Sequence, residues 1–155
     1  MFLSDIDVSD FDTVFIDRDG VINRLRPNDY VKTWEEFEFI DGVFEAFALW
    51  NKTLKHIIII TNQRGVGKGL MTEKTLREIH RNMVNEIEKH GGRIDKIYCC
   101  IAVNNDDPDR KPNIGMFIHA RKDFPDIDSN KALMIGDSDS DIEFAKNAGI
   151  KGVKL

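Results

Sequence analysis

The sequence has little of what marks several classes of protein. Its two cysteines, Cys99 and Cys100, are adjacent, so they do not form a disulfide framework. No apolar run approaches the length of a membrane span. There is no basic excess either, because the formal net charge is −5. Surfaces that bind nucleic acid or anionic membranes are usually basic, so we expect neither as a partner.

The first residues, Met1–Asp5, lack the basic start and the long apolar run of a signal peptide. Hydrophobic residues make up 41% of the 155 residues, which is the composition of a folded, soluble protein. A chain of this length fits one domain with its own core. We therefore expect a cytoplasmic protein with a single domain over residues 1–155.

Strand and helix patterns alternate along the chain. Apolar runs predict buried strands at 13–16, 57–60 and 133–135, and weaker patterns predict strands at 94–101 and 150–155. The helices between them are expected to face inward with Val43, Phe47 and Trp50, with Leu76, Ile79, Met83 and Ile87, with Ile114, Phe117 and Ile118, and with Ile142 and Ala145. This alternation predicts an α/β fold of three layers, with helices on both faces of a doubly wound, mainly parallel sheet.

Four short polar motifs lie at the ends of predicted strands or before a predicted helix. They are Asp17-Arg18-Asp19-Gly20, Thr61-Asn62-Gln63, Arg110-Lys111-Pro112 and Gly136-Asp137-Ser138-Asp139-Ser140-Asp141. Ligands of doubly wound folds bind at the carboxyl ends of the strands. Together the motifs supply acids, a hydroxyl and a cation, which is typical of phosphoryl transfer through an aspartyl-phosphate beside a bound Mg²⁺ ion.

The acids of these motifs predict a cation site. Two carboxylates as close as Asp17 and Asp19 are not both freely ionised without a cation, and Asp137 and Asp141 add two more acids. Mg²⁺ prefers oxygen ligands and is often held by a few carboxylates and a substrate phosphate. Each acid by itself is also consistent with a turn or a helix cap, so the prediction depends on all four motifs occurring in this order.

Thr61 and Lys111, the hydroxyl and the cation of these motifs, also have purely structural interpretations. Thr61 followed by backbone N–H groups suits phosphate oxygens, but a lone threonine often simply ends a strand. Lys111 supplies a point charge for a transferring phosphoryl group, but a lone lysine in the charged stretch 106–111 is often a surface residue. The position of Lys111 before Pro112 and a helix start favours the functional interpretation.

Other features of the sequence give weaker evidence about function. The segment Gly65–Gly69 is not a nucleotide-binding P-loop, because Asn62 and Gly69 stand where glycine and serine or threonine are required, and we expect a turn at the mouth of the site. The four histidines, His56, His80, His90 and His119, show no ligand spacing and are expected on the surface or on helix faces. The polar stretch 23–33 is expected to cross over the strand ends, and Trp34, Phe37 and Phe39 are expected to be packing residues.

The four motifs, with Gly65, Gly69, Gly115 and Met116, resemble the haloacid dehalogenase superfamily of phosphohydrolases. Within it, the chain is similar to the small capless group that contains heptose 1,7-bisphosphate 7-phosphatase and histidinol-phosphate phosphatase. The segment Phe37–Val43 is also similar to that group, and the resemblance extends over about residues 12–154. It implies a Rossmann-like core without a large cap domain.

The resemblance also implies residue roles. Asp17 would be the nucleophile, and Asp19 the general acid and then the base. Asp17, the backbone carbonyl of Asp19 and Asp137 would hold Mg²⁺, supported by Asp141. Thr61 and Lys111 would bind the phosphoryl oxygens, Arg110 would recognise the rest of the substrate, and Asn62, Gln63 and Arg64 would line the site. In the first step Asp17 must be ionised and Asp19 protonated, so we expect their environments to separate their pKa values.

The chain departs from that group at two places. Many members bind a structural zinc ion through cysteine and histidine residues in the loop before Arg110, but residues 103–109 contain neither. One thiol does not make a four-ligand site, so we expect no structural zinc. Members of the heptose group also often have lysine where this chain has Ser138, and Arg26, Arg64 and Lys68 are the cations that could compensate.

The resemblance implies a Mg²⁺-dependent phosphatase for a small phosphorylated metabolite, with a sugar phosphate such as heptose 1,7-bisphosphate as the leading substrate. Histidinol phosphate and the 3′-phosphate ends of nucleic acids are alternative substrates within the superfamily. An alternative of another class is a signalling receiver domain, which also uses aspartate, Mg²⁺, threonine and lysine. A receiver carries its phospho-acceptor after a middle strand of the sequence, whereas here the two acids follow the first strand.

Overall fold

The computed structural model describes residues 1–155. The strands are β1 (Thr13–Ile16), β2 (His56–Asn62), β3 (Lys96–Cys100), β4 (Ala132–Gly136) and β5 (Lys151–Lys154). The α-helices are α1 (Val43–Thr53), α2 (Arg64–Gly67), α3 (Glu73–Lys89), α4 (Gly115–Asp123) and α5 (Asp139–Ala148), and the 3₁₀ turns are η1 (Leu3–Asp5), η2 (Trp34–Glu36) and η3 (Ser129–Lys131).

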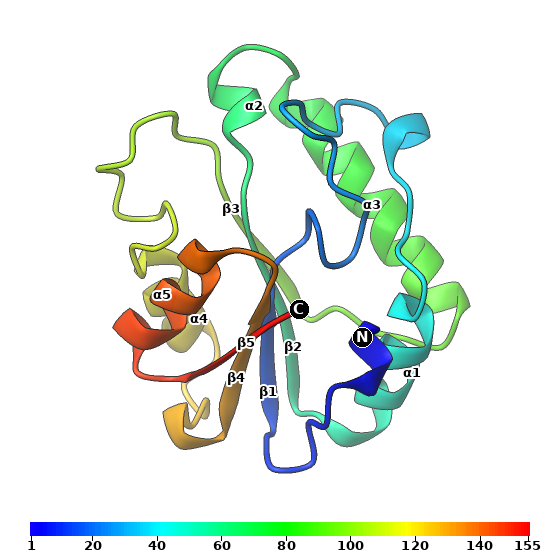
Figure 1. The fold of residues 1–155 in the computed structure, drawn as a ribbon, viewed down its shortest axis with the longest axis vertical. Coiled ribbons are helices and arrows are strands. Elements are labelled where there is room, and N and C mark those ends of the chain that lie inside the picture. Colours follow the sequence, from blue (N-terminus) through cyan, green and yellow to red (C-terminus); the bar gives the residue numbers. More distant parts are fainter.

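The five strands form one sheet in the order β3-β2-β1-β4-β5, and every neighbouring pair is parallel. The central strand β1 places Val14 opposite Ile57 of β2 and Leu133 of β4. All side chains of β1 and β4 are buried, as expected for strands covered on both faces. The sheet crosses the middle of the molecule, and the loops that follow the strands gather at one end of it (Figure 1).

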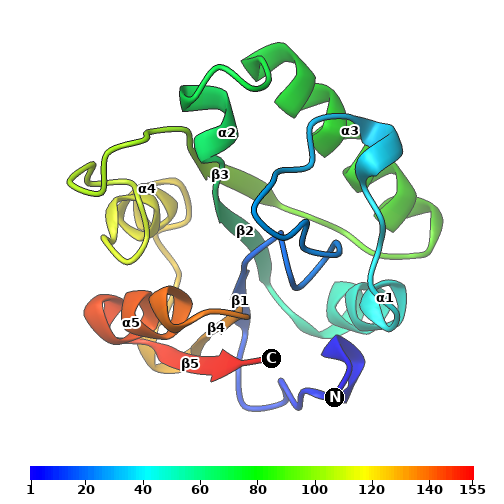
Figure 2. The ribbon, with the colours of Figure 1, turned by 45° about the horizontal axis from the view of Figure 1, so that its top comes forward.

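Helices cover both faces of this sheet, which confirms the predicted fold class of three layers without a large cap domain. Helices α1 and α3 pack on one face, where Phe47 and Met83 meet Val14 and Ile59 in the larger hydrophobic cluster. Helices α4 and α5 pack on the other, where Phe117 and Phe144 meet strand residues of the smaller cluster. The two pairs lie on opposite sides of the strands in both ribbon views (Figure 2). None of the helices has the length and apolar run that a membrane crossing requires.

Two expected inward-facing residues lie elsewhere. Ile118 of α4 is 47% exposed, and Ile142 of α5 is only half-buried. In α4 the buried residues are Met116, Phe117 and Ala120, so the inward face keeps Phe117 of the predicted stripe but not Ile118. The prediction for Ile118 was wrong because a short helix with few apolar residues gives an ambiguous stripe.

The segment between β1 and α1 crosses over the strand ends, as expected. Its apolar residues Val21, Ile22 and Val31 are buried in the larger cluster. The Trp34 and Phe37 rings stack with centroids 5.0 Å apart, which confirms that they are packing residues. The segment Gly65–Gly69, expected to be a turn, instead begins within α2.

The different burial of Phe117 and Ile118 should appear in the free energy of unfolding. The Phe117 ring lies 5.4 Å from the Phe15 ring of β1 and 6.4 Å from the Phe144 ring of α5, measured between centroids. Phe117→Ala should lower the free energy of unfolding by about 3–5 kcal/mol, whereas Ile118→Ala, on the exposed face, should change it by less than about 0.5 kcal/mol. Urea titration of both variants measures these changes. Equal losses would contradict the structure and support the predicted stripe, in which both residues face inward.

Candidate active site

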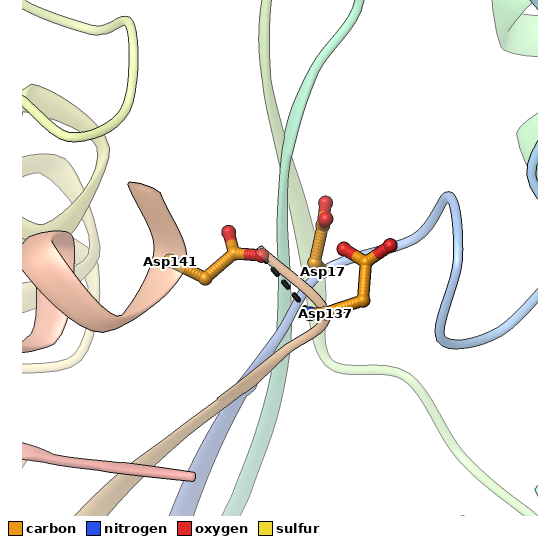
Figure 3. Close-up of side chains that lie close together, drawn as sticks. All are labelled: Asp17, Asp137 and Asp141. Carbon is orange, nitrogen blue, oxygen red and sulfur yellow. Dashed lines mark hydrogen bonds between the residues drawn. The ribbon is translucent and has the colours of Figure 1, made fainter. Parts of the chain in front are cut away.

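Three carboxylates meet at the carboxyl ends of the two central strands. Asp17 follows β1, Asp137 follows β4, and Asp141 comes from the first turn of α5 (Figure 3). One oxygen from each lies within 4.8 Å of the others. Gly20 makes this approach possible: it has φ +86°, and a Cβ atom at this position would overlap the Asp137 carboxylate. The acids of the first and last polar motifs therefore meet at the strand ends, as predicted.

The ammonium group of Lys111 lies among these acids. Its Nζ atom is 3.0 Å from Asp17 Oδ1 and 2.8 Å from Asp141 Oδ1, and the residue is 4% exposed. Burial acts to lower the pKa of Lys111, but Asp17 and Asp141 outweigh burial and raise it. Lys111 is therefore a buried, charged group beside the Asp17 carboxylate rather than a surface lysine.

Asp141 is the most completely bonded of the three acids. Its Oδ2 atom accepts hydrogen bonds from the backbone N–H groups of Asp137 and Ser138 and from the Ser138 hydroxyl, while its Oδ1 atom pairs with Lys111. These bonds fix the turn between β4 and α5. The Asp137 carboxylate, in contrast, makes no ion pair and lines the cavity.

Asp19 is held differently from the other acids. Its Oδ1 atom accepts from Arg18 Nη2 at 2.8 Å and from Asn23 Nδ2 at 3.0 Å, and its Oδ2 atom accepts from Gln63 Nε2 at 2.8 Å. The carboxylate is therefore turned toward hydrogen-bond donors, and it is not part of the cluster formed by Asp17, Asp137 and Asp141.

The environments of Asp17 and Asp19 separate their pKa values in the opposite sense to that expected. Burial raises the pKa of Asp17 to about 7, although Lys111 opposes this. Burial also acts to raise the pKa of Asp19, but the Arg18 charge and the hydrogen bonds it accepts outweigh burial and lower it. The expectation was wrong because it ignored Arg18, which lies between the two acids in sequence. A divalent cation beside Asp17 would favour its ionised form.

The Thr61-Asn62-Gln63 motif lies at the end of β2, and its side chains bond mainly to other groups of the protein. Thr61 is fully buried, and its hydroxyl accepts from Gln63 Nε2 at 2.9 Å. Gln63 is 1% exposed and links Thr61 to Asp19. The Asn62 amide accepts from the Lys111 backbone N–H and donates to the Lys111 carbonyl oxygen. Of these three residues, only Asn62 lines the cavity.

Arg64 and Arg110, predicted to bind substrate, lie together, and neither lines the cavity above the acids. Both guanidinium groups donate to Asn105 Oδ1, at 2.6 Å from Arg64 Nη2 and 3.2 Å from Arg110 Nε. Burial and the Arg64 charge lower the pKa of Arg110. Arg110 Nη1 and Arg64 Nε are buried without a hydrogen-bond partner in the protein. Two like charges sharing one neutral acceptor form a place that favours an anion.

The cavity above the acids has a volume of about 280 Å³. Its wall opposite the strand ends comes from the segment after β1, with Leu25, Arg26, Asp29, Tyr30 and Val31, and its other side includes Ser138 and Ser140. Arg26, suggested above as a compensating cation, pairs with Glu36 at 2.9 Å and Asp29 at 3.4 Å. Its charge is therefore already opposed by two acids.

The loop at 103–109 is organised by an acid and an amide. Asp107 Oδ1 accepts from the Asp109 backbone N–H at 2.9 Å and lies 3.7 Å from Cys100 Sγ, and Asn113 donates to two backbone carbonyl oxygens of the loop. Cys99 faces His80 of α3 instead. The two thiols are free and have different surroundings.

Two residues of this region were missed in the sequence. Arg18 is fully buried beside Asp19, and His80, expected on the surface or on a helix face, is 8% exposed and lies 3.0 Å from Arg18. His80 follows Leu76 by four residues and precedes Met83 by three, so it lies on the apolar stripe of α3. That spacing could have predicted its burial.

The chain is similar to known phosphatases. Residues 6–153 match the model of the family described as polynucleotide kinase 3 phosphatase. A D-glycero-beta-D-manno-heptose-1,7-bisphosphate 7-phosphatase from Rhodopseudomonas palustris is 39% identical over 154 aligned residues, covering 91% of this chain and 81% of that protein. A D-glycero-alpha-D-manno-heptose-1,7-bisphosphate 7-phosphatase from Mycobacterium bovis is 36% identical, covering 86% of this chain and 71% of that protein.

A solved structure is also similar. It is the D,D-heptose 1,7-bisphosphate phosphatase from B. bronchiseptica, complexed with magnesium and phosphate, with a TM-score of 0.85 and 29% identity. The comparison covers 92% of this chain and 79% of that one. The receiver-domain alternative is set aside, because these relatives are phosphatases. The chain belongs to the polynucleotide kinase 3 phosphatase family within the haloacid dehalogenase superfamily, and it is a phosphatase.

Proposed function

We propose that this protein hydrolyses a phosphate monoester of a small sugar, such as heptose 1,7-bisphosphate, through an aspartyl-phosphate on Asp17 and with bound Mg²⁺. The observation that carries the proposal is the position of Lys111 Nζ, 3.0 Å from Asp17 Oδ1 at the bottom of the cavity. An ammonium in this place would stabilise the oxygens of a phosphoryl group that Asp17 receives.

The acids fit a magnesium ion. Asp17 and Asp137 offer hard oxygen ligands at the edge of the cavity, and the three-acid cluster spans no more than 4.8 Å between ligand atoms. Mg²⁺ needs few protein carboxylates because it retains waters and binds substrate phosphate. In our proposal Asp17, the Asp19 carbonyl and Asp137 would hold the ion and Asp141 would support it. Bound there, Mg²⁺ would polarise the phosphoryl group and offset its charge.

The protein's own residues would divide the chemistry as follows. The Asp17 carboxylate attacks phosphorus, and Asp19 gives a proton to the leaving oxygen as the ester bond breaks. Asp19 must first take up this proton against the donors that lower its pKa. Water then attacks phosphorus and gives a proton to Asp19, and the bond between Asp17 and phosphorus breaks. Lys111 would hold the phosphoryl oxygens in both steps, with Thr61 beneath the site.

The surroundings of the cavity favour a polar substrate with a second anionic group. Arg64 and Arg110 do not line the cavity, but in our proposal these two cations, which share the neutral acceptor Asn105, would bind a phosphate that is not transferred. The Ser138 and Ser140 hydroxyls and the Asp29 carboxylate line the cavity itself, where sugar hydroxyls would bind. The printed functions of the relatives above support the same class of substrate.

We also propose that residues 1–155 form one phosphatase domain, which acts on a free metabolite in the cytoplasm. The formal net charge of −5 supports a small substrate over nucleic acid.

Phosphate release from a panel of metabolites tests the proposal. The panel holds both anomers of heptose 1,7-bisphosphate, histidinol phosphate and a DNA end with a 3′-phosphate. The wild-type protein should hydrolyse the heptose substrates with the highest kcat/KM. Asp17→Asn, which keeps the side-chain shape and removes the nucleophile, should lower turnover by at least about 1,000-fold. Near-normal turnover by this variant would contradict the covalent mechanism. A preference for the DNA end would contradict the proposed sugar substrate.

The metal requirement gives a second prediction. EDTA should abolish phosphate release and added Mg²⁺ should restore it. Asp137→Asn should raise the Mg²⁺ concentration for half-maximal activity by about 10-fold or more, because one charged ligand is lost. Asp139→Asn is the matched control, since Asp139 is 96% exposed and pairs with Lys154. Full activity in EDTA would contradict the metal site, and one tightly held zinc ion per chain would contradict the expectation for residues 103–109.

The roles of Arg110 and Lys111 give a third prediction. Lys111→Ala should lower kcat strongly with heptose bisphosphate and with a simple aryl phosphate, because both place the transferred group beside it. Arg110→Ala should lower kcat/KM by roughly 10- to 100-fold with the bisphosphate, the value of a hydrogen bond to a charged group, and much less with the aryl phosphate. Arg24→Ala removes the same charge from an exposed pair with Glu38 and should affect neither. Equal losses for Arg110→Ala on both substrates would show that Arg110 is not a recognition residue.

A further inference from the structure

A buried arginine links helix α3 to the Asp19 carboxylate. Arg18 is 0% exposed, its Nη2 atom lies 2.8 Å from Asp19 Oδ1, and its Nη1 atom lies 3.0 Å from His80 Nε2. The guanidinium also lies over the Phe37 ring, 5.7 Å from its centroid. The cavity-lining acid is therefore connected, through one side chain, to a residue that does not line the cavity.

The contact between Arg18 and His80 fixes the form of the imidazole. A guanidinium in a protein only donates hydrogen bonds, so His80 Nε2 must accept and carries no proton. The neutral ring then has its proton on Nδ1, which lies 3.8 Å from Cys99 Sγ. Burial and the Arg18 charge lower the pKa of His80 to about 3, which agrees with a neutral ring.

The imidazole supplies the only hydrogen bond that holds the far side of the guanidinium. Arg18 Nε is buried without a partner, so removing the acceptor on α3 would leave a second buried N–H group unpaired. An unpaired buried donor is costly, and the guanidinium would turn toward another acceptor. Asp19 Oδ1 would then keep Asn23 alone, since Gln63 bonds Oδ2.

We infer that Arg18 and His80 form a positioning pair that fixes the Asp19 carboxyl group for proton transfer. This inference rests on the proposed function, in which Asp19 gives a proton to the leaving oxygen and later takes one from water. His80 touches neither substrate nor reacting atoms, so its effect is transmitted through Arg18.

The two proton transfers give this role a specific signature. An alkyl alcohol leaves as a poor alkoxide and needs the proton from Asp19, whereas a nitrophenolate leaves readily without one. A misplaced Asp19 should therefore slow phosphoryl transfer from alkyl phosphates but not from p-nitrophenyl phosphate. It should slow the second step for both, since water loses its proton to Asp19 there. A general loss of stability would affect the two substrates equally, and a loss of sugar recognition would not slow the second step.

The test compares His80→Leu, which removes the acceptor, with His80→Gln, whose side-chain oxygen can accept from Arg18. The substrates are the best sugar phosphate of the wild-type protein and p-nitrophenyl phosphate. His80→Leu should lower kcat/KM by about 10-fold or more for the sugar phosphate and by less than about 3-fold for the aryl phosphate. It should also release one nitrophenolate per chain in a rapid burst. His80→Gln should stay within about 3-fold of the wild type.

His90→Leu is the matched control, because His90 is exposed at the end of the same helix and stacks on Phe44. It should change neither kcat/KM. Equal effects of His80→Leu on both substrates, or none, would overturn the positioning role. The wild-type protein offers a check that needs no variant: ¹⁵N NMR should find His80 neutral with its proton on Nδ1, and a proton on Nε2 would overturn the pair. Failure of the proposed function is distinguishable, because it would appear as no Asp17-dependent turnover in the wild-type protein.

Discussion

One buried ammonium group balances the acids on which this site is built. The Lys111 charge lies 3.0 Å and 2.8 Å from oxygens of Asp17 and Asp141, in surroundings that exclude most water. A charge in such a place is stable only when it is paired and hydrogen-bonded. Asn62 at the end of β2 bonds the Lys111 backbone in both directions, so the position of the ammonium is set by the sheet itself.

The strand order explains why the acids converge. Strand β1 lies between β2 and β4, and its end is therefore flanked by Asn62 at the end of β2 and by Asp137 directly after β4. Asp141 bonds the backbone that follows β4 with one oxygen and Lys111 with the other. Removal of Asp141 would therefore disturb both the turn after β4 and the position of the Lys111 ammonium group.

The sequence predicted the features that depend on local pattern. Continuous apolar runs predicted β1, β2 and β4, and the acids expected after two of these runs, Asp17 and Asp137, lie together at the strand ends. Features that depend on distant parts of the chain were not predictable in this way. The low pKa of Asp19 comes from donors at positions 18, 23 and 63, and the pairing of Arg26 with Glu36 requires the fold of a loop. His80 was missed because a histidine on an apolar stripe shows its partner only when Arg18 is placed in space.

The segment that walls the cavity opposite the acids is anchored in the core by Val21, Ile22 and Val31, and it pairs its charged side chains mainly with one another. Arg26 and Lys32 pair with Asp29 and Glu36, and Arg24 pairs with Glu38, all between β1 and α1. None of these pairs includes Asp17, Lys111 or Asp137. Sequence changes within the wall can therefore accumulate without disturbing the ammonium and the acids, so an enzyme of this design can acquire a new substrate in evolution while its hydrolytic machinery stays the same.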